Sequence, residues 1–183
     1  MRESATGAAR SPGPRAGARV AVLAEARWSG AQDGAAPGVA GFVHSGFAPT
    51  VVAVAERCLR RRYRAAPVPT DVRTAVVLVS ASGDRASAEQ VRATVDAGGR
   101  VGPLFFFQSV PNSVAGHLAA RWGLRGPVVC LSPTGDPRAD GIAEADLLLY
   151  DGDADEVLLI LIEQAPDAST EAVAVLLGGG ARP

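Results

Sequence analysis

The segment from residue 73 to residue 80 most constrains the fold of this chain. It reads Arg-Thr-Ala-Val-Val-Leu-Val-Ser, an unbroken aliphatic run without the alternation of a half-exposed strand. Runs of this kind are typical of strands buried on both faces in a parallel or mixed sheet that is covered by helices. The segment therefore predicts an α/β fold.

Other apolar runs and their punctuation predict the remaining elements. Four further strands are expected at residues 20–24, 128–131, 156–162 and 172–177, the first of them buried. Four helices are expected at residues 50–64, 87–97, 111–122 and 137–150, with Thr50 and Ser87 as N-caps and Gly123 closing the third. Residues 30–49 are rich in glycine and proline and predict a long loop. The expected architecture is a mainly parallel or mixed sheet of about five strands with helices on its faces.

Composition limits the class of protein. A chain of 183 residues fits one domain, expected at residues 19–178 between a disordered tail (1–18) and a flexible tail (179–183). The net charge of −1 gives no general reason to expect nucleic acid as a partner. Two cysteines are too few for a disulfide scaffold, and no long apolar run follows the N-terminal basic residues. A cytoplasmic location without membrane binding is expected.

A motif in the second half of the chain resembles a known family. It comprises Asn112, Ala115, Gly116, His117, Gly123, Leu124, Gly126, Pro127 and Ser132, followed by Asp-Gly-Asp-Ala-Asp at 151–155. The pattern closely resembles that of the β-ketoacyl synthases of the thiolase-like fold. The resemblance covers the N-terminal half of that family only. The second half, which supplies the two catalytic histidines of the family, is expected to be missing.

The same alignment bears on catalysis. Between Gly126-Pro127 and Asp151-Gly152 the spacing equals that of the family without a gap, which places Gly135 where the family carries its nucleophilic cysteine. Condensation in this family needs a thiolate to hold the acyl chain, and glycine has no side chain to acylate. Cys130 lies inside a predicted strand and is expected to be a small buried hydrophobe. No catalytic residue and no cofactor are therefore predicted.

Two apolar segments are candidates for a partner interface. In the family the strand before the nucleophile pairs antiparallel with its partner, which implicates Val128, Val129, Cys130, Leu131 and Ser132. The family segment that corresponds to Phe105, Phe106 and Phe107 lies near the dimer interface and the acyl-chain pocket. A hydrophobic contact surface and plain core packing are both open for the three phenylalanines.

A basic cluster ends the predicted helix at residues 50–64. It consists of Arg57, Arg60, Arg61, Arg62 and Arg64, charges that suit the negative end of a helix dipole. A solvated helix end explains the cluster without any function. Because ketosynthases receive their substrates from acidic acyl carrier proteins, the resemblance also implies a docking patch for such a partner.

Other polar residues give weaker signals. The aspartates at 136, 140, 151, 153 and 155 lack the glycine and terminal glutamate of a calcium loop, so they predict helix ends and turns and no metal site. His44 and His117 are interpreted as structural. The turn from Ser80 to Asp84 matches neither common phosphate-binding glycine pattern.

The leading hypothesis is a non-catalytic ketosynthase-like subunit of a polyketide or fatty-acid type pathway. It would act in a homodimer or heterodimer with a ketosynthase-like subunit, or by binding an acyl carrier protein. One alternative is a degenerate enzyme that uses Ser132, Asp136 or Cys130 in a different acyl-transfer or cyclisation reaction. Another is a stand-alone acyl-ligand binder that uses Phe105–Phe107. The sequence identifies neither the pathway product nor the partner.

Overall fold

The structure is a computed structural model that describes residues 20–164 and 170–179. The tails predicted at 1–18 and 179–183 lie outside the described residues, except for Gly179.

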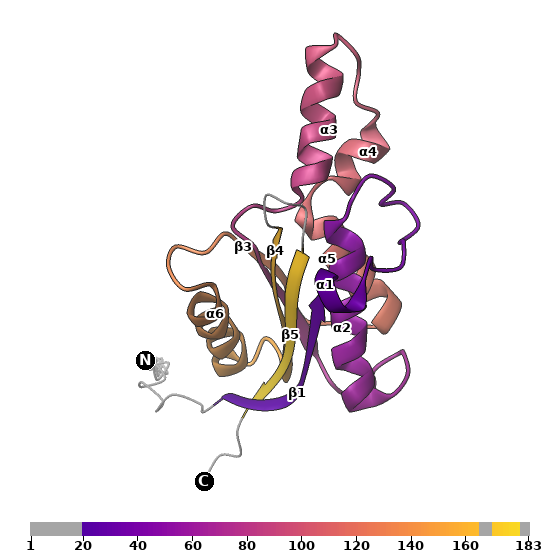
Figure 1. The fold of residues 1–183 in the computed structure, drawn as a ribbon. Helices are drawn as coiled ribbons and strands as arrows, with labels where there is room; N and C mark the ends of the chain where they lie inside the picture. Colours follow the sequence, from indigo (N-terminus) through magenta and orange to yellow (C-terminus); the bar gives the residue numbers. More distant parts are fainter. Residues whose placement is uncertain (1–19, 165–169, 180–183) are drawn as a thin grey trace, which may run out of the picture.

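One five-stranded sheet has the order β1-β5-β4-β2-β3 (Figure 1). Its strands are β1 (Val20–Ser29), β2 (Thr74–Val79), β3 (Val128–Leu131), β4 (Glu156–Gln164) and β5 (Thr170–Gly179). β2 pairs parallel with β3 and β4, whereas β5 pairs antiparallel with β4 and β1. The predicted mixed sheet is confirmed.

Helices cover both faces of the sheet (Figure 1). α2 (Phe47–Tyr63) and α5 (Pro111–Trp122) pack on one face, and α6 (Pro137–Asp151) packs on the other. All six residues of β2 are buried, and the apolar residues from Ala75 to Val79 alternate between the two cores. Val76 and Leu78 contribute to the core under α2 and α5, while Val77 and Val79 contribute to the core under α6. This double burial is the reason for the unbroken aliphatic run.

α6 approaches the sheet closely at Gly141. A Cβ atom at this position would lie 2.6 Å from Leu159 Cδ1 and 3.1 Å from Val79 Cγ2, so a larger residue would push the helix outward. The opposite side of α6 meets water, and Ile142 and Leu147 on it are 36% and 52% exposed. This segment also carries Arg138, Asp140, Glu144 and Asp146, charged side chains of the kind that rarely lie fully buried.

β1 differs from its prediction. It runs to Ser29 rather than ending near residue 24, and its first half is not buried: Val22 is 57% exposed and Leu23 is 39% exposed. The reason is its position, because β1 is an edge strand that pairs only with β5. Residues 20–24 have the aliphatic composition of a central strand, but they lie at the edge of the sheet.

Two helix starts also differ from their predictions. α2 begins at Phe47, before the expected N-cap Thr50, and Ser45 Oγ accepts a hydrogen bond from the N–H of Ala48 at 2.8 Å. The predicted loop at 30–49 also contains a short helix, α1 (Gly30–Asp33). α3 (Arg85–Asp96) begins two residues early because Asp84, not Ser87, is its N-cap.

A helical hairpin projects from one end of the sheet. It consists of α3 and α4 (Pro103–Gln108), and Figure 1 shows both rising away from the packed layers. α4 follows Pro103, which suits the first turn of a helix because proline lacks an N–H group. The hairpin carries the three consecutive phenylalanines outside the main core.

Candidate functional site

The turn between β3 and α6 holds the residues at which the family resemblance places catalysis. Asp140 Oδ2 accepts hydrogen bonds from the N–H of Thr134 at 2.7 Å and from the N–H of Gly135 at 3.2 Å. Asp136 caps the helix, since its Oδ1 accepts from the N–H of Ala139 at 2.7 Å. N–H groups at such a turn commonly bind anions. Here the carboxylates of the chain itself bind them.

These contacts fix the charge of Asp140. The hydrogen bonds from the N–H groups of Thr134 and Gly135 lower the pKa of the Asp140 carboxyl below its ordinary value. The group is therefore a carboxylate at neutral pH. Its negative charge opposes the formation of any second anion in this turn.

The nearby candidate nucleophiles are poorly activated. Burial raises the pKa of the Cys130 thiol to about 11, so it is protonated at neutral pH. This agrees with the prediction that Cys130 packs as a hydrophobe, although it is only partly buried. Ser132 is exposed, and within residues 20–164 and 170–179 it has no hydrogen bond to a histidine or carboxylate that would act as its base.

The other candidate polar residues lie at helix ends and turns. Asp155 accepts from the N–H of Arg73 at 2.8 Å, while Asp151 and Asp153 lie at the end of α6 and just beyond it. The turn from Ser80 to Asp84, which matched neither phosphate-binding glycine pattern, contacts a carboxylate: Glu163 accepts from the N–H of Ala81 at 2.5 Å and from Ser82 Oγ at 3.1 Å. No group of three potential metal ligands occurs among the described residues.

β3 is the second edge strand of the sheet. The carbonyl oxygen of Pro127, just before β3, accepts from Val76 N at 2.9 Å, and that of Leu131 accepts from Ser80 N, just after β2, at 3.1 Å. Alternate residues of a strand direct their backbone groups to opposite sides, so Val128 and Cys130 direct theirs to the free edge. The predicted interface strand thus has an edge without a partner strand in the described sheet.

The three phenylalanines of α4 differ in exposure. Phe106 and Phe107 are 60% and 65% exposed, and the neighbouring Leu104 is 69% exposed. Phe105 is partly buried, and the ring of His44 meets it edge-on with centroids 5.2 Å apart. The contact with His44 therefore accounts for Phe105 outside the main core, whereas Phe106 and Phe107 present an apolar surface.

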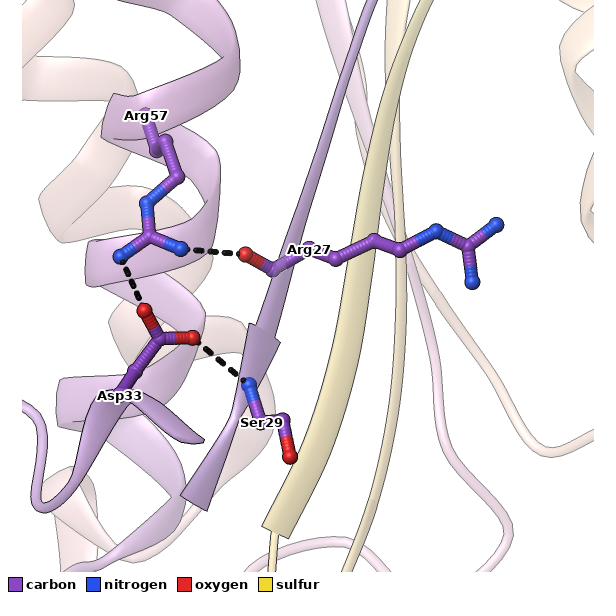
Figure 2. A network of polar contacts seen from close by, with 4 residues as sticks. All are labelled: Arg27, Ser29, Asp33 and Arg57. Carbon is purple, nitrogen blue, oxygen red and sulfur yellow. Dashed lines mark hydrogen bonds and ion pairs between the residues drawn. The ribbon is translucent and has the colours of Figure 1, made fainter. Parts of the chain in front are cut away.

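The structure does not gather the five clustered arginines in one place. Arg57 faces β1, where Nη1 donates to the carbonyl of Arg27 at 2.6 Å and Nη2 to Asp33 Oδ1 at 2.9 Å (Figure 2). Asp33 also accepts from the N–H of Ser29 at 3.0 Å. The hydrogen bond from Arg57 holds the pKa of Asp33 below its ordinary value. Figure 2 shows how this network ties α2 to the end of β1.

The remaining arginines have different contacts from one another. Arg62 lies 3.5 Å from Glu156 and over the ring of Tyr63. Arg60 donates to Glu56 Oε2 at 2.5 Å, and Arg64 follows the last residue of the helix. Arg61 donates to the carbonyl of Glu25. The arginines of the cluster therefore contact different neighbours and do not all lie on one surface.

Sequence reasoning missed two residues of this region. Arg121 on α5 donates from Nε to Glu56 Oε1 at 2.5 Å, so Glu56 bridges Arg60 and Arg121. The spacing of Glu56 and Arg60, four apart on one helix, was a usable signal for the first pair. Nothing local in the sequence indicates the pair of Glu56 and Arg121.

His117 contacts Phe42 edge-on, with ring centroids 5.9 Å apart.

Comparison with known proteins identifies the family. The sequence model of the family described as beta-ketoacyl synthase, N-terminal domain, matches residues 45–174. No curated protein sequence matches this chain. In the part of the chain that the structure describes, no helix is both long and apolar enough to cross a membrane.

Solved structures show the same fold. A ketosynthase (ApeO) in complex with its chain length factor (ApeC) from Xenorhabdus doucetiae is similar at 25% identity and a TM-score of 0.60, over 77% of this chain and 60% of the other. The ishigamide ketosynthase/chain length factor matches at 15% identity and a TM-score of 0.69, over 88% and 62%. A beta-ketoacyl synthase from Burkholderia phymatum matches at 15% identity and a TM-score of 0.69, over 89% and 59%.

The chain thus spans about 60% of the length of these structures. The family match covers most of the described sheet and both of its helical layers. The resemblance expected from the motif at 112–132 is confirmed at the level of family and fold. This chain belongs to the β-ketoacyl synthase family, by its N-terminal domain, and has the thiolase-like fold.

Proposed function

We propose that this chain is a non-catalytic ketosynthase-like subunit that acts by association with a ketosynthase-like partner in a polyketide or fatty-acid type pathway. Its family membership and its likeness to ketosynthase and chain length factor structures support this reading. The observation that carries the proposal is the Asp140 carboxylate bound to the N–H groups of Thr134 and Gly135.

That contact bears on catalysis because a condensing nucleophile must be a thiolate. Position 135, which the alignment assigns to the nucleophile, is a glycine. The neighbouring N–H groups that would stabilise an anion are bound to Asp140, and the nearest cysteine has a pKa raised to about 11. Residues that would hold and activate an acyl group are therefore replaced by residues that stabilise the turn.

Association is supported by the free edge of β3. Val128 and Cys130 direct backbone groups outward, and an edge strand of this kind readily pairs with another chain. The exposed Phe106 and Phe107 supply apolar surface. Both features suit a dimer, either with a second copy or with a ketosynthase-like subunit.

A carrier protein is the second partner that we propose. The side chains of Arg60 and Arg62, at the end of α2, are 56% and 45% exposed. Each already pairs with a glutamate, so an acidic partner would add to these ion pairs. Arg57 contributes least, because it is committed to Asp33 and Arg27.

The proposed pairing through the edge of β3 is tested by removing the outward N–H group of Cys130. Cys130→Pro removes it, while Cys130→Ser changes the side chain and keeps the N–H group. Sedimentation of each variant, alone and with a co-expressed ketosynthase, is expected to show association for wild type and Cys130→Ser and its loss for Cys130→Pro. Circular dichroism checks that Cys130→Pro is folded. Equal association of both variants would contradict pairing through β3.

The proposed absence of acyl transfer is tested with an acyl N-acetylcysteamine thioester. Incubation with the wild-type chain, followed by intact-mass spectrometry, is expected to show no acyl adduct. An adduct at Ser132 or Cys130 would establish the degenerate-enzyme alternative. A lipid that co-purifies with the chain and shields Phe106 and Phe107 from solvent would support the acyl-binder alternative instead.

A further inference from the structure

A groove lies on the outer face of α2, away from the turn and from β3. Its volume is about 620 Å³, within the range of small-molecule sites. Trp28, Val39 and Val52 line it and pack against the main core, which makes this part of the wall apolar and firmly supported. Arg60, Arg61 and Arg121 line it as well and make one part basic. We call this site the α2 groove.

The wall beside β1 is fixed before any ligand binds. The Arg57 guanidinium lies 4.5 Å from the centroid of the Trp28 ring, and its N–H groups bind Arg27 and Asp33 (Figure 2). These contacts hold Trp28 against α2 and engage one donor on each terminal nitrogen of Arg57. The apolar surface of the groove is therefore preorganised, and Arg57 positions it.

The basic part of the groove has positive charge in excess. Its four arginines, including Arg57, meet two carboxylates, those of Asp33 and Glu56. Glu56 is buried, while the side chains of Arg60 and Arg121 that bind it are 56% and 57% exposed. Arg61 binds only a backbone carbonyl and has no ion pair among residues 20–164 and 170–179. Two positive charges thus remain beside an apolar wall.

We propose that the α2 groove binds an amphipathic phosphate monoester, with its alkyl portion on Trp28, Val39 and Val52 and its phosphate on Arg60, Arg61 and Arg121. A phosphate monoester carries up to two negative charges at neutral pH, which matches the excess. Guanidinium groups also present paired N–H donors that suit phosphate oxygens. The groove shares Arg60 with the proposed carrier-protein surface, but no residue of β3 or of the turn takes part, so the proposal does not depend on the proposed non-catalytic role or on pairing through β3.

Three ligands test the two halves of the site by isothermal titration calorimetry on the whole chain. Octyl phosphate, below its micelle concentration, is the probe; octyl glucoside keeps the alkyl chain without charge, and inorganic phosphate keeps the charge without the chain. Octyl phosphate is expected to bind at least about tenfold more tightly than either control, because only it uses both surfaces. Equal affinity of the probe and either control would overturn the proposal.

Variants localise the binding. Arg61→Gln is expected to weaken octyl phosphate binding about tenfold, the value of one charge-assisted hydrogen bond. Arg62→Gln is the matched control, because it removes the same charge from the next residue, which faces Tyr63 and Glu156. Its affinity is expected to stay within about twofold of wild type. Equal losses in the two variants would indicate nonspecific attraction and refute the site.

A measurement on the wild-type chain avoids reliance on variants that fold poorly. Trp28 lines the groove, whereas Trp122 is 2% exposed in the core. Titration with octyl phosphate is expected to shift the NMR signal of the Trp28 indole N–H and to leave that of Trp122 unchanged. Trp28→Phe assigns the two signals. An unshifted Trp28 signal at saturation would place the ligand elsewhere and overturn the proposal.

Discussion

Arg121 Nε on α5 lies 2.5 Å from Glu56 Oε1 on α2, which joins two helices that are 65 residues apart in the chain at this point. Glu56 is 7% exposed, and its other oxygen accepts from Arg60. The buried carboxylate thus ties together the outer layer that covers the main core.

Glu56→Gln is expected to lower the free energy of unfolding by about 1–2 kcal/mol, because a neutral amide binds the two guanidinium groups more weakly. The half-exposed arginines recover part of the loss by binding water. Urea denaturation measures the change. Glu89→Gln, at an exposed position of α3, is the control and is expected to change stability by less than about 0.5 kcal/mol.

Substitution by alanine is expected to destabilise the fold at Gly126 and to have little effect at Gly135. A Cβ atom at Gly126 would lie 2.6 Å from Ala75 N and 2.7 Å from Thr74 C, both backbone atoms that cannot move without disturbing β2. Gly126→Ala is expected to cost about 3 kcal/mol, as overpacking does. Gly135→Ala meets nothing within 4 Å and is expected to be near neutral. Thermal melting of the pair measures both; equal melting temperatures would contradict the described approach of the β3 loop to β2.

A cysteine placed at position 135 is expected to remain a thiol at neutral pH. The side chain has room, but the Asp140 carboxylate holds the N–H groups of Thr134 and Gly135 and would repel a thiolate. Its pKa is expected to stay at or above about 8.5, the ordinary value for cysteine. Site-resolved alkylation by iodoacetamide against pH measures the pKa of Gly135→Cys. The double variant Gly135→Cys/Asp140→Asn is expected to give a lower pKa, and an unchanged value would show that Asp140 has no effect on the turn.

Asp140 is also expected to stabilise the fold in a pH-dependent manner. Because its folded-state pKa lies below the ordinary 3.8, its contribution is present above that pH and is lost as pH falls through the lower folded value. Asp140→Asn is therefore expected to be less stable than wild type at pH 7, with the difference shrinking toward pH 2. Urea midpoints at both pH values test this. A constant difference would mean that the charge of Asp140 does not contribute.

The native cysteines are expected to react slowly. Burial raises the pKa of Cys58 and of Cys130 to about 11, and both stay protonated at pH 8. Alkylation of the folded chain at pH 8 is expected to be at least tenfold slower than that of the chain in urea, where both thiols have ordinary values near 8.5. Rapid modification of Cys130 in the folded chain would argue that it is an activated nucleophile.

The sequence predicted the parts of the fold that local patterns determine. The aliphatic run of β2 indicated burial on both faces, and Gly123, with φ +67°, ends α5 where the sequence placed its end. β1 was misjudged because its aliphatic side chains are those of a central strand, whereas only the pairing order shows that it is an edge. α4 was missed because a six-residue helix is too short for a periodic pattern.

The sites were harder to predict than the elements. The turn at Gly135 came from the motif alignment, but the role of Asp140 in that turn required the geometry of the helix start. The α2 groove combines residues of β1, α2, α5 and the loop between α1 and α2, which no single segment reveals. The clustered arginines suggested one patch, whereas the helix turns Arg57 and Arg62 toward different neighbours.

The contacts of Asp140 and Glu163 have a consequence for evolution. Each carboxylate is tethered to the turn that it binds, so an incoming anion would compete with a group held at high effective concentration. A cysteine placed at position 135 would leave this internal competitor in place. Under the proposed non-catalytic function, a return to condensation chemistry through this turn would thus need at least two coordinated substitutions.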